Sequence, residues 1–249
     1  PRSGEAAQGR LYSLRAMSRP HRSLLLVLCA ATSLLFAQKK TPAVQTKTPT
    51  ELSMERQGLV DLRSVDPSIQ VSLMYGRADN FTGQVLYTEL RTAYLLPSTA
   101  AALKRAQTEL KRLRPDLSLK VYDAARPMSV QQKMFNVVAG TPKSIYVSNP
   151  ANGGGLHNYG LAVDITLCNA ATGDTIPMGT KIDYMGRLSH VNLEQEFLKQ
   201  KRISPAAVAN RRLLRRVMAV GGFKVLRTEW WHFNFKTRAQ AKAHYKLIQ

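Results

Sequence analysis

Apolar residues recur along this chain with helical spacing in some segments and in strict alternation in others. Residues 97–114 are predicted to form an amphipathic helix, because apolar residues at helical spacing share one stripe: Leu103, Ala106, Leu110 and Leu113. Residues 117–122 alternate between apolar and polar, which predicts a strand. Further strands are predicted at 69–75, 161–167 and 223–235. A short helix is predicted at 129–135, after Pro127, and a terminal helix at 237–247. The Ser204–Pro205 cap predicts a helix that ends at Gly221–Gly222. Strands and helices mixed without regular alternation favour an α+β domain.

The N-terminal part of the chain divides into three segments that differ from the globular remainder. Residues 17–37 combine a short basic stretch, an apolar core and small residues, which is typical of a secretory signal peptide cleaved after Ala37. The core holds about 14 apolar or small residues, fewer than the roughly 20 that span a bilayer, so no stable membrane span is expected after cleavage; an uncleaved anchor is the alternative. Residues 1–16 precede a plausible start at Met17 and are interpreted as an over-extended upstream segment. Residues 38–58, rich in Thr, Lys, Gln and Pro, are interpreted as a flexible linker.

Globular patterning continues from there to the end, so residues 59–249 are predicted to form one domain. Together with the signal peptide, this predicts an exported protein of the periplasm or cell envelope. Cys29 lies in the predicted signal peptide, which leaves Cys168 as the one cysteine of the mature chain and excludes an intramolecular disulfide. The exported domain must therefore be held by its core, by a metal ion, or by both.

The charge of the chain is strongly positive, with 36 Lys and Arg against 16 Asp and Glu and a formal net charge of +20. Such an excess is typical of proteins that bind nucleic acid. The basic residues are scattered, however, with no run of five or more and no nucleic-acid-binding motif. We therefore predict no nucleic-acid partner and interpret the charge as a solvated basic surface that suits an anionic envelope.

Two histidines and one aspartate stand out as candidate metal ligands. His157 follows three consecutive glycines, and His232 lies in a predicted strand among aromatic residues. Asp164 lies in the apolar strand 161–167, where a carboxylate is costly unless it is paired, hydrogen-bonded or bound to a metal. Two imidazoles and one carboxylate suit catalytic zinc, which keeps its fourth position for water. The alternative is structural, with hydrogen-bonded core histidines and an aspartate that caps a turn or pairs with an arginine.

Glu229, three residues before His232, favours the catalytic interpretation. A water molecule that attacks a carbonyl needs a base to take its proton, and a carboxylate beside the metal is a usual choice. Residues three apart in a regular strand face opposite ways, so this hypothesis requires a turn or bulge around Thr228–Trp230. For His190 and His244 we expect surface positions or hydrogen-bonded structural ones.

Several short motifs occur together along the chain. The sequence HNYGLAVD at 157–164 and the sequence EWWHF at 229–233 contain the candidate ligands, and GTKID at 179–183 lies between them. DNFTG at 79–83 and DAARP at 123–127 come earlier, whereas NRRLL at 210–214, Met218 and Gly222–Phe223 follow GTKID. In this combination the chain resembles the zinc D-alanyl-D-alanine dipeptidases, the family that includes the vancomycin-resistance dipeptidases, over roughly residues 59–236.

The resemblance implies an enzyme with one Zn²⁺ per chain that hydrolyses the small dipeptide D-Ala-D-Ala to two D-alanines in cell-wall peptide turnover. It implies that the zinc ligands are His157, Asp164 and His232. It further implies that Glu229 is the catalytic acid/base, that Arg126 stabilises the oxyanion, and that Asp183 receives the ammonium group of the substrate. The implied fold is the α+β one shared with zinc D,D-carboxypeptidases and hedgehog-like signalling domains, a small antiparallel sheet with flanking helices. No particular oligomeric state is implied.

The chain also departs from the family pattern. The family often has Ser two residues before the first His ligand and Arg two residues after it, where this chain has Gly155 and Tyr159. These departures affect the expected substrate contacts and leave the ligands in place. Two other functions are compatible with the motifs: a zinc D,D-carboxypeptidase or endopeptidase acting on peptidoglycan stem peptides, and a non-catalytic envelope-binding module. Glu229 and Arg126 argue against the module, although Arg126 has a structural alternative as an ion-pair partner of Asp123.

Overall fold

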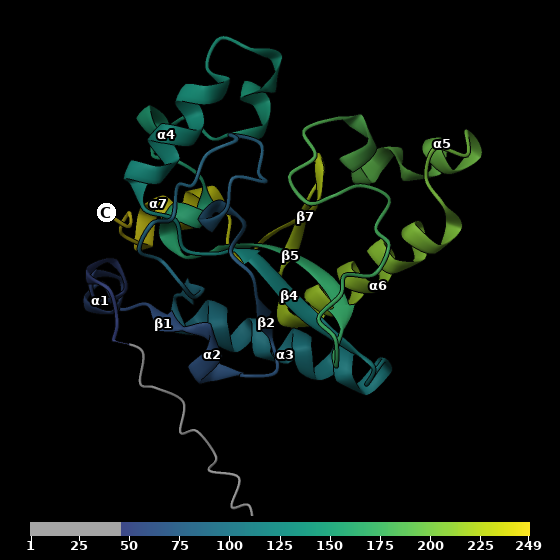
Figure 1. The fold of residues 1–249 in the computed structure, drawn as a ribbon, viewed down its shortest axis with the longest axis horizontal. Coiled ribbons are helices and arrows are strands. Elements are labelled where there is room, and N and C mark those ends of the chain that lie inside the picture. The colour runs from purple at the N-terminus through teal and green to yellow at the C-terminus, as the bar shows by residue number, and fades with distance from the viewer. Residues whose placement is uncertain (1–45) are drawn as a thin grey trace, which may run out of the picture. The chain divides into compact units, whose positions relative to one another are not determined.

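Five strands form the central sheet of the protein, in the order β2–β4–β5–β7–β6 (Figure 1). The computed structural model describes residues 46–249. The strands are β2 (Gln70–Val71), β4 (Leu117–Asp123), β5 (Ala162–Asn169), β6 (Lys224–Leu226) and β7 (Glu229–Asn234). Neighbouring strands are antiparallel except for β2 and β4, which are parallel. The expected mixture of helices with a small antiparallel sheet is therefore confirmed apart from the outer strand β2. The relation to zinc D,D-carboxypeptidases and hedgehog-like domains stays a prediction.

Two long helices, α3 (Pro97–Leu113) and α6 (Pro205–Gly221), pack against each other and against the sheet (Figure 1). Helix α3 was expected from its apolar stripe and α6 from the Ser204–Pro205 cap, and Leu110 of α3 and Leu214 of α6 are fully buried between helices and sheet. Helix α6 begins at Ser204, whose hydroxyl accepts a hydrogen bond from the backbone N–H of Ala207. The two helices thus cover one face of the sheet. The polar side chains of β4 and β5 lie on the other face.

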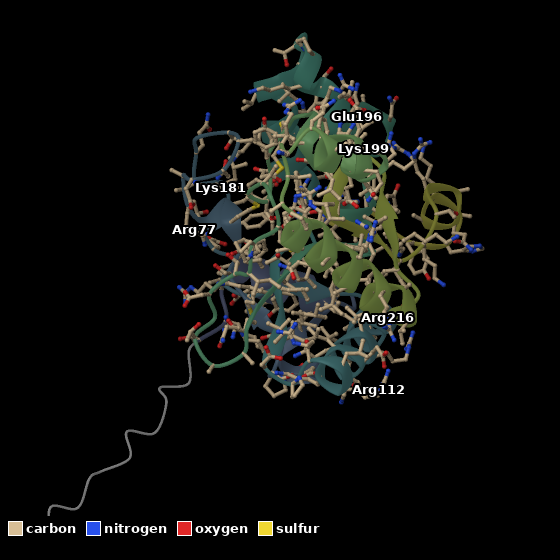
Figure 2. All side chains as sticks on the ribbon, turned by 90° about the vertical axis from the view of Figure 1, so that its right-hand side faces the viewer. Arg77, Arg112, Lys181, Glu196, Lys199 and Arg216 are labelled. Carbon is tan, nitrogen blue, oxygen red and sulfur yellow. The ribbon has the colours of Figure 1, made fainter. Side chains whose placement is uncertain are left out.

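The remaining elements are short and lie around this core. A second pair of strands joins β1 (Val60–Asp61) to β3 (Tyr94–Leu95). The other helices are α1 (Pro49–Arg56), α2 (Leu62–Val65), α4 (Met128–Val138), α5 (Glu194–Lys199) and α7 (Arg238–His244). Charged side chains of the helices, such as Arg112, Lys199 and Arg216, are exposed at the surface (Figure 2). Within residues 46–249, no helix has both the length and the apolar character needed to cross a bilayer.

The structure corrects the expected flexible linker at 38–58. Residues Pro49–Arg56 form helix α1, and its Met54 is buried in the core. The helix starts with a capping box, in which Thr48 accepts from the backbone of Glu51 and the Glu51 carboxylate accepts from the backbone of Thr48. A capping threonine followed by proline and then by glutamate is a helix-start signal that outweighs the polar composition of the segment. The predicted upstream segment 1–16 and signal peptide 17–37 lie outside the described residues.

A second correction concerns the single strand expected at 223–235, which is a hairpin of β6 and β7 joined by a turn at Arg227–Thr228. Its pairing is irregular, because Val225 is opposite Phe233 whereas Leu226 is opposite Glu229. Residues 230–232 therefore bulge out of the ladder between these two pairs. The strand expected at 69–75 is also shorter than predicted, since β2 is followed by a turn of 3₁₀-helix at Met74–Gly76.

Candidate active site

The three predicted metal ligands come together although they are far apart in the sequence. Asp164 of β5 is directly opposite His232 of β7 in the antiparallel ladder, which places both side chains on the same face of the sheet. His157 belongs to a short 3₁₀ turn, Leu156–Tyr159, just before β5. Its Nε2 atom lies 3.1 Å from Nδ1 of His232 and 3.3 Å from Oδ1 of Asp164, and the latter two atoms are 3.0 Å apart. Tetrahedral zinc with bonds of about 2.0–2.2 Å separates its ligand atoms by roughly 3.4 Å, so the spacing of this set fits zinc.

Hydrogen bonds on the outer side of each imidazole direct an unprotonated nitrogen into this centre. Nδ1 of His157 lies 2.7 Å from the carbonyl oxygen of Ala124, and Nε2 of His232 lies 2.8 Å from Oδ1 of Asn234. Because both partners are acceptors, the protons are assigned to these outer nitrogens, and the inner nitrogens present lone pairs. Two lone pairs and a carboxylate oxygen then face one another at close range. This arrangement is repulsive unless a cation lies between them, so the donor chemistry fits a bound metal ion.

The turn that carries His157 is fastened to the end of β4. The backbone N–H of Arg126 donates to the carbonyl of His157 at 3.0 Å, and Nδ2 of Asn158 donates to the carbonyl of Arg126 at 2.9 Å. Gly154 has a φ of 61°, and a Cβ atom there would lie 2.3 Å from Oδ1 of Asn158. The glycines before His157 therefore allow the loop to pass close to this turn, which fixes the ligand relative to β4.

Glu229 lies beside the ligands, as the catalytic interpretation requires. The bulge at residues 230–232 confirms the irregularity expected near this position and lets Glu229 and His232 line the same pocket. Oε2 of Glu229 is 4.0 Å from Nδ1 of His232. Burial raises the pKa of Glu229 to about 8, and the negative charge of Asp164 adds to this effect while His232 opposes it. A carboxyl group in this range can both accept and donate a proton near neutral pH.

Arg126 is held at the pocket by an ion pair and an amide. Its Nε and Nη2 atoms both donate to Oδ2 of Asp123, and its Nη1 donates to Oε1 of Gln131 at 2.8 Å. The structural pairing with Asp123 is therefore real. It leaves one N–H on each terminal nitrogen of the guanidinium, which lines the pocket. Burial disfavours the cation, but the neighbouring acidic groups, with Asp123 first among them, together outweigh burial and hold the pKa of Arg126 above its ordinary value. Arg126 thus stays positively charged beside the predicted metal site.

Asp183 lies at another side of the same pocket with an unusual backbone. Its φ of 67° is left-handed, a conformation that aspartate tolerates better than most residues. Oδ1 accepts from the Tyr75 hydroxyl at 3.1 Å, and Oδ2 accepts from the backbone N–H of Phe81 at 2.9 Å. Burial raises its pKa to about 6. No side chain among residues 46–249 forms an ion pair with it. The carboxylate is therefore available to a cationic group entering the pocket.

A single pocket of about 370 Å³ contains all the predicted site residues: Arg126, His157, Asp164, Asp183, Glu229 and His232. A family model described as D-ala-D-ala dipeptidase matches residues 55–249. The chain belongs to the D-Ala-D-Ala dipeptidase family.

Curated relatives agree with this membership. The D-alanyl-D-alanine dipeptidase of Escherichia coli K12 is 33% identical over 181 residues, which cover 73% of this chain and 86% of that protein. The enzyme of the same name from Enterococcus faecalis is 29% identical over 178 residues, covering 64% of this chain and 82% of the relative. A third, from Streptomyces coelicolor, is 30% identical over 179 residues, covering 65% and 83%. The resemblance and the prediction of a hydrolase of the dipeptidase class are confirmed.

The structure adds site residues of this D-Ala-D-Ala dipeptidase family member that sequence reasoning did not single out. Tyr75 and Phe81 hold Asp183, and Gln131 holds Arg126. Asn234 could have been found, because it lies two residues after His232 on the same face of a strand. Tyr146 could not, since it lies in a loop segment with no periodic pattern and reaches the pocket only through the fold.

Proposed function

We propose that this chain is an exported zinc peptidase that hydrolyses D-Ala-D-Ala to two D-alanines in cell-wall peptide turnover. The observation that carries this proposal is the pocket in which two imidazole lone pairs and Asp164 converge beside a buried glutamate, with an unpaired carboxylate at Asp183. Family membership supports the same reaction class. The family names D-Ala-D-Ala, and the free carboxylate gives a physical reason for a substrate with an unblocked amino terminus.

His157, Asp164 and His232 would hold the zinc ion, and two of them are oriented for it by Ala124 and Asn234. When bound, Zn²⁺ supplies Lewis acidity that polarises the scissile carbonyl and makes water more acidic. Oriented outer hydrogen bonds of this kind typically raise metal affinity, because they fix the imidazole tautomer and ring plane.

Glu229 would take a proton from the attacking water and deliver it to the departing amino group. It is suited to both steps, because burial holds its pKa near neutrality and because its Oε2 atom lies 4.0 Å from Nδ1 of His232. Arg126 would stabilise the negative charge that develops on the carbonyl oxygen. Its guanidinium is fixed by Asp123 and Gln131 before substrate arrives, so little reorganisation is needed during the reaction.

Asp183 would receive the ammonium group of the substrate. A half-buried carboxylate with two neutral donors, Tyr75 and Phe81, gains an ionic partner only when such a substrate binds. An N-acylated peptide brings an uncharged amide instead and leaves Asp183 desolvated and unpaired, at a cost of several kcal/mol. The pocket therefore favours a free dipeptide over a stem peptide, whose D-Ala-D-Ala end is N-acylated.

The decisive experiment compares D-Ala-D-Ala with its N-acetyl derivative at equal enzyme concentration. We expect kcat/KM for the free dipeptide to be at least about a hundredfold higher, which corresponds to roughly 2.7 kcal/mol of transition-state binding. Comparable rates on the two compounds would instead support a carboxypeptidase.

We further propose export to the periplasm or cell envelope, on the basis of the signal-peptide pattern at 17–37. Fractionation of cells that express the full chain tests this proposal. Recovery of the mature protein in the cytoplasmic fraction, with residues 17–37 still attached, would contradict it.

A further inference from the structure

A hydrogen bond joins two segments that are distant in the sequence and that both contribute residues to the wall of the active-site pocket. The hydroxyl of Tyr146 lies 3.0 Å from Nε2 of His190. Tyr146 ends a 3₁₀ turn, Pro142–Tyr146, that follows α4, and His190 lies in the segment that leads to α5. Figure 1 shows the two segments on the same side of the sheet, one after α4 and the other before α5.

Tyr146 belongs to the pocket wall, and its position marks the rim. Tyr146 and its neighbour Ile145 both line the pocket, yet Ile145 is 73% exposed, so this stretch lies where the pocket meets solvent. Met185, from the segment that contains His190, lines the same pocket. Within residues 46–249, the bond from Tyr146 to His190 is the only hydrogen bond between segment 139–155 and segment 178–191.

The chemistry of the pair suits a bond that is intact at neutral pH. Burial, together with the charge of Arg187, lowers the pKa of His190, so its neutral imidazole can accept a hydrogen bond from the Tyr146 hydroxyl. Tyr146 and Glu229 line the same pocket.

We propose that the Tyr146–His190 hydrogen bond is a bar across the pocket mouth that restricts the substrate to a dipeptide. The proposal rests on the dipeptidase function proposed above. A dipeptide lies beneath the bar, whereas a third residue on either side of the cleaved bond has to pass the rim that the bar closes. Tyr146 and His190 are then specificity-determining residues that act without contacting the reacting atoms.

The tripeptide D-Ala-D-Ala-D-Ala separates this role from that of Asp183. Its amino group is free, so cleavage of the first bond allows the same ammonium contact that D-Ala-D-Ala makes. If the enzyme cleaves this first bond more slowly in the tripeptide than in the dipeptide, the cause is therefore the length of the peptide and not a missing charge.

The experiment measures initial rates on D-Ala-D-Ala and on tri-D-alanine for the wild type, Tyr146→Phe, His190→Ala and the double variant. We expect the tripeptide-to-dipeptide ratio of kcat/KM to rise at least about tenfold in each single variant. The double variant should resemble the single ones, because both substitutions break the same bond. Tyr184→Phe is the matched control: it removes a hydroxyl from an exposed tyrosine that does not line the pocket and should leave the ratio unchanged.

An unchanged ratio in both single variants, or an equal rise in the Tyr184→Phe control, overturns the bar. If the wild type fails to cleave D-Ala-D-Ala at all, the proposed function is wrong. The role of the Tyr146–His190 bond is then tested by calorimetry, which measures the Kd of each of the two peptides for the same zinc-loaded proteins. In that case the ratio of Kd values should shift by the same factor, and no shift overturns the proposal.

Discussion

Replacing Asp183 by asparagine is expected to stabilise the fold at neutral pH while weakening catalysis. Burial raises the pKa of this carboxyl to about 6 from the ordinary 3.8, so its ionised form is disfavoured in the folded protein. One pKa unit corresponds to about 1.4 kcal/mol. Since the side chain is only half-buried and partly screened by solvent, the ionised carboxylate costs the folded state about 1–3 kcal/mol at pH 7.

The substitution is chosen because it leaves the local geometry intact. Asparagine tolerates the left-handed φ of 67° at least as well as aspartate does. Its amide oxygen can still accept from the backbone of Phe81, and its NH₂ group can donate to the Tyr75 oxygen. The change therefore removes the charge and little else.

The pH dependence gives the sign of the effect. Because the folded-state pKa lies above the unfolded one, the folded protein binds the proton more tightly, and this contribution to stability is lost as pH rises from about 4 through about 6. Asparagine removes that loss. Thermal unfolding at pH 8 should therefore show a Tm about 2–12 °C higher for the variant, at about 2–4 °C per kcal/mol, with little difference at pH 4 or below.

Activity should change in the opposite direction. The substrate ammonium loses its ionic partner, so kcat/KM for D-Ala-D-Ala should fall at least about thirtyfold. A variant with the wild-type Tm at pH 8 would refute the account of its stability. A variant that keeps more than about a third of wild-type kcat/KM would refute the role of Asp183 in binding.

Three further predictions concern the metal, the catalytic residues and the first helix. Elemental analysis should find one zinc per chain, and chelation should abolish peptidase activity; full activity with well under one equivalent of any divalent metal would contradict the zinc proposal. Glu229→Ala should retain the metal but lower kcat by about 10²–10⁴, and Arg126→Ala by about 10²–10³, because each removes a group that acts in the transition state. More than about a tenth of wild-type kcat in either variant would remove that residue from the mechanism. Met54→Ala should lower the free energy of unfolding by about 2–5 kcal/mol because Met54 is buried, whereas Leu52→Ala, at a position 42% exposed, should have a much smaller effect. Equal effects of these two substitutions would show that α1 does not pack on the domain.

The parts of the fold that sequence patterns predicted are those governed by neighbours along the chain. Helix α3 follows from its apolar stripe, and α6 follows from the cap at Ser204 and Pro205 and from the glycines that end it. The start of α1 could have been predicted by the same local rules, because Thr48 and Glu51 form a capping box. The polar composition of the segment led instead to the prediction of a linker. The shortened β2 and the divided 223–235 strand were not predicted, because strand limits depend on the partner strands.

The site divides in the same way. The sequence by itself determined the types of residue available for the chemistry, since His157, Asp164, His232 and Glu229 lie in motifs that resemble a known family. Only the tertiary structure decided their mutual positions, through the pairing of β5 with β7 and the bulge at residues 230–232. It also brought Tyr75 to Asp183 and Tyr146 to His190 across separations of 108 and 44 residues. Contacts of that kind depend on how the whole chain packs around its core, and no local period or spacing encodes them.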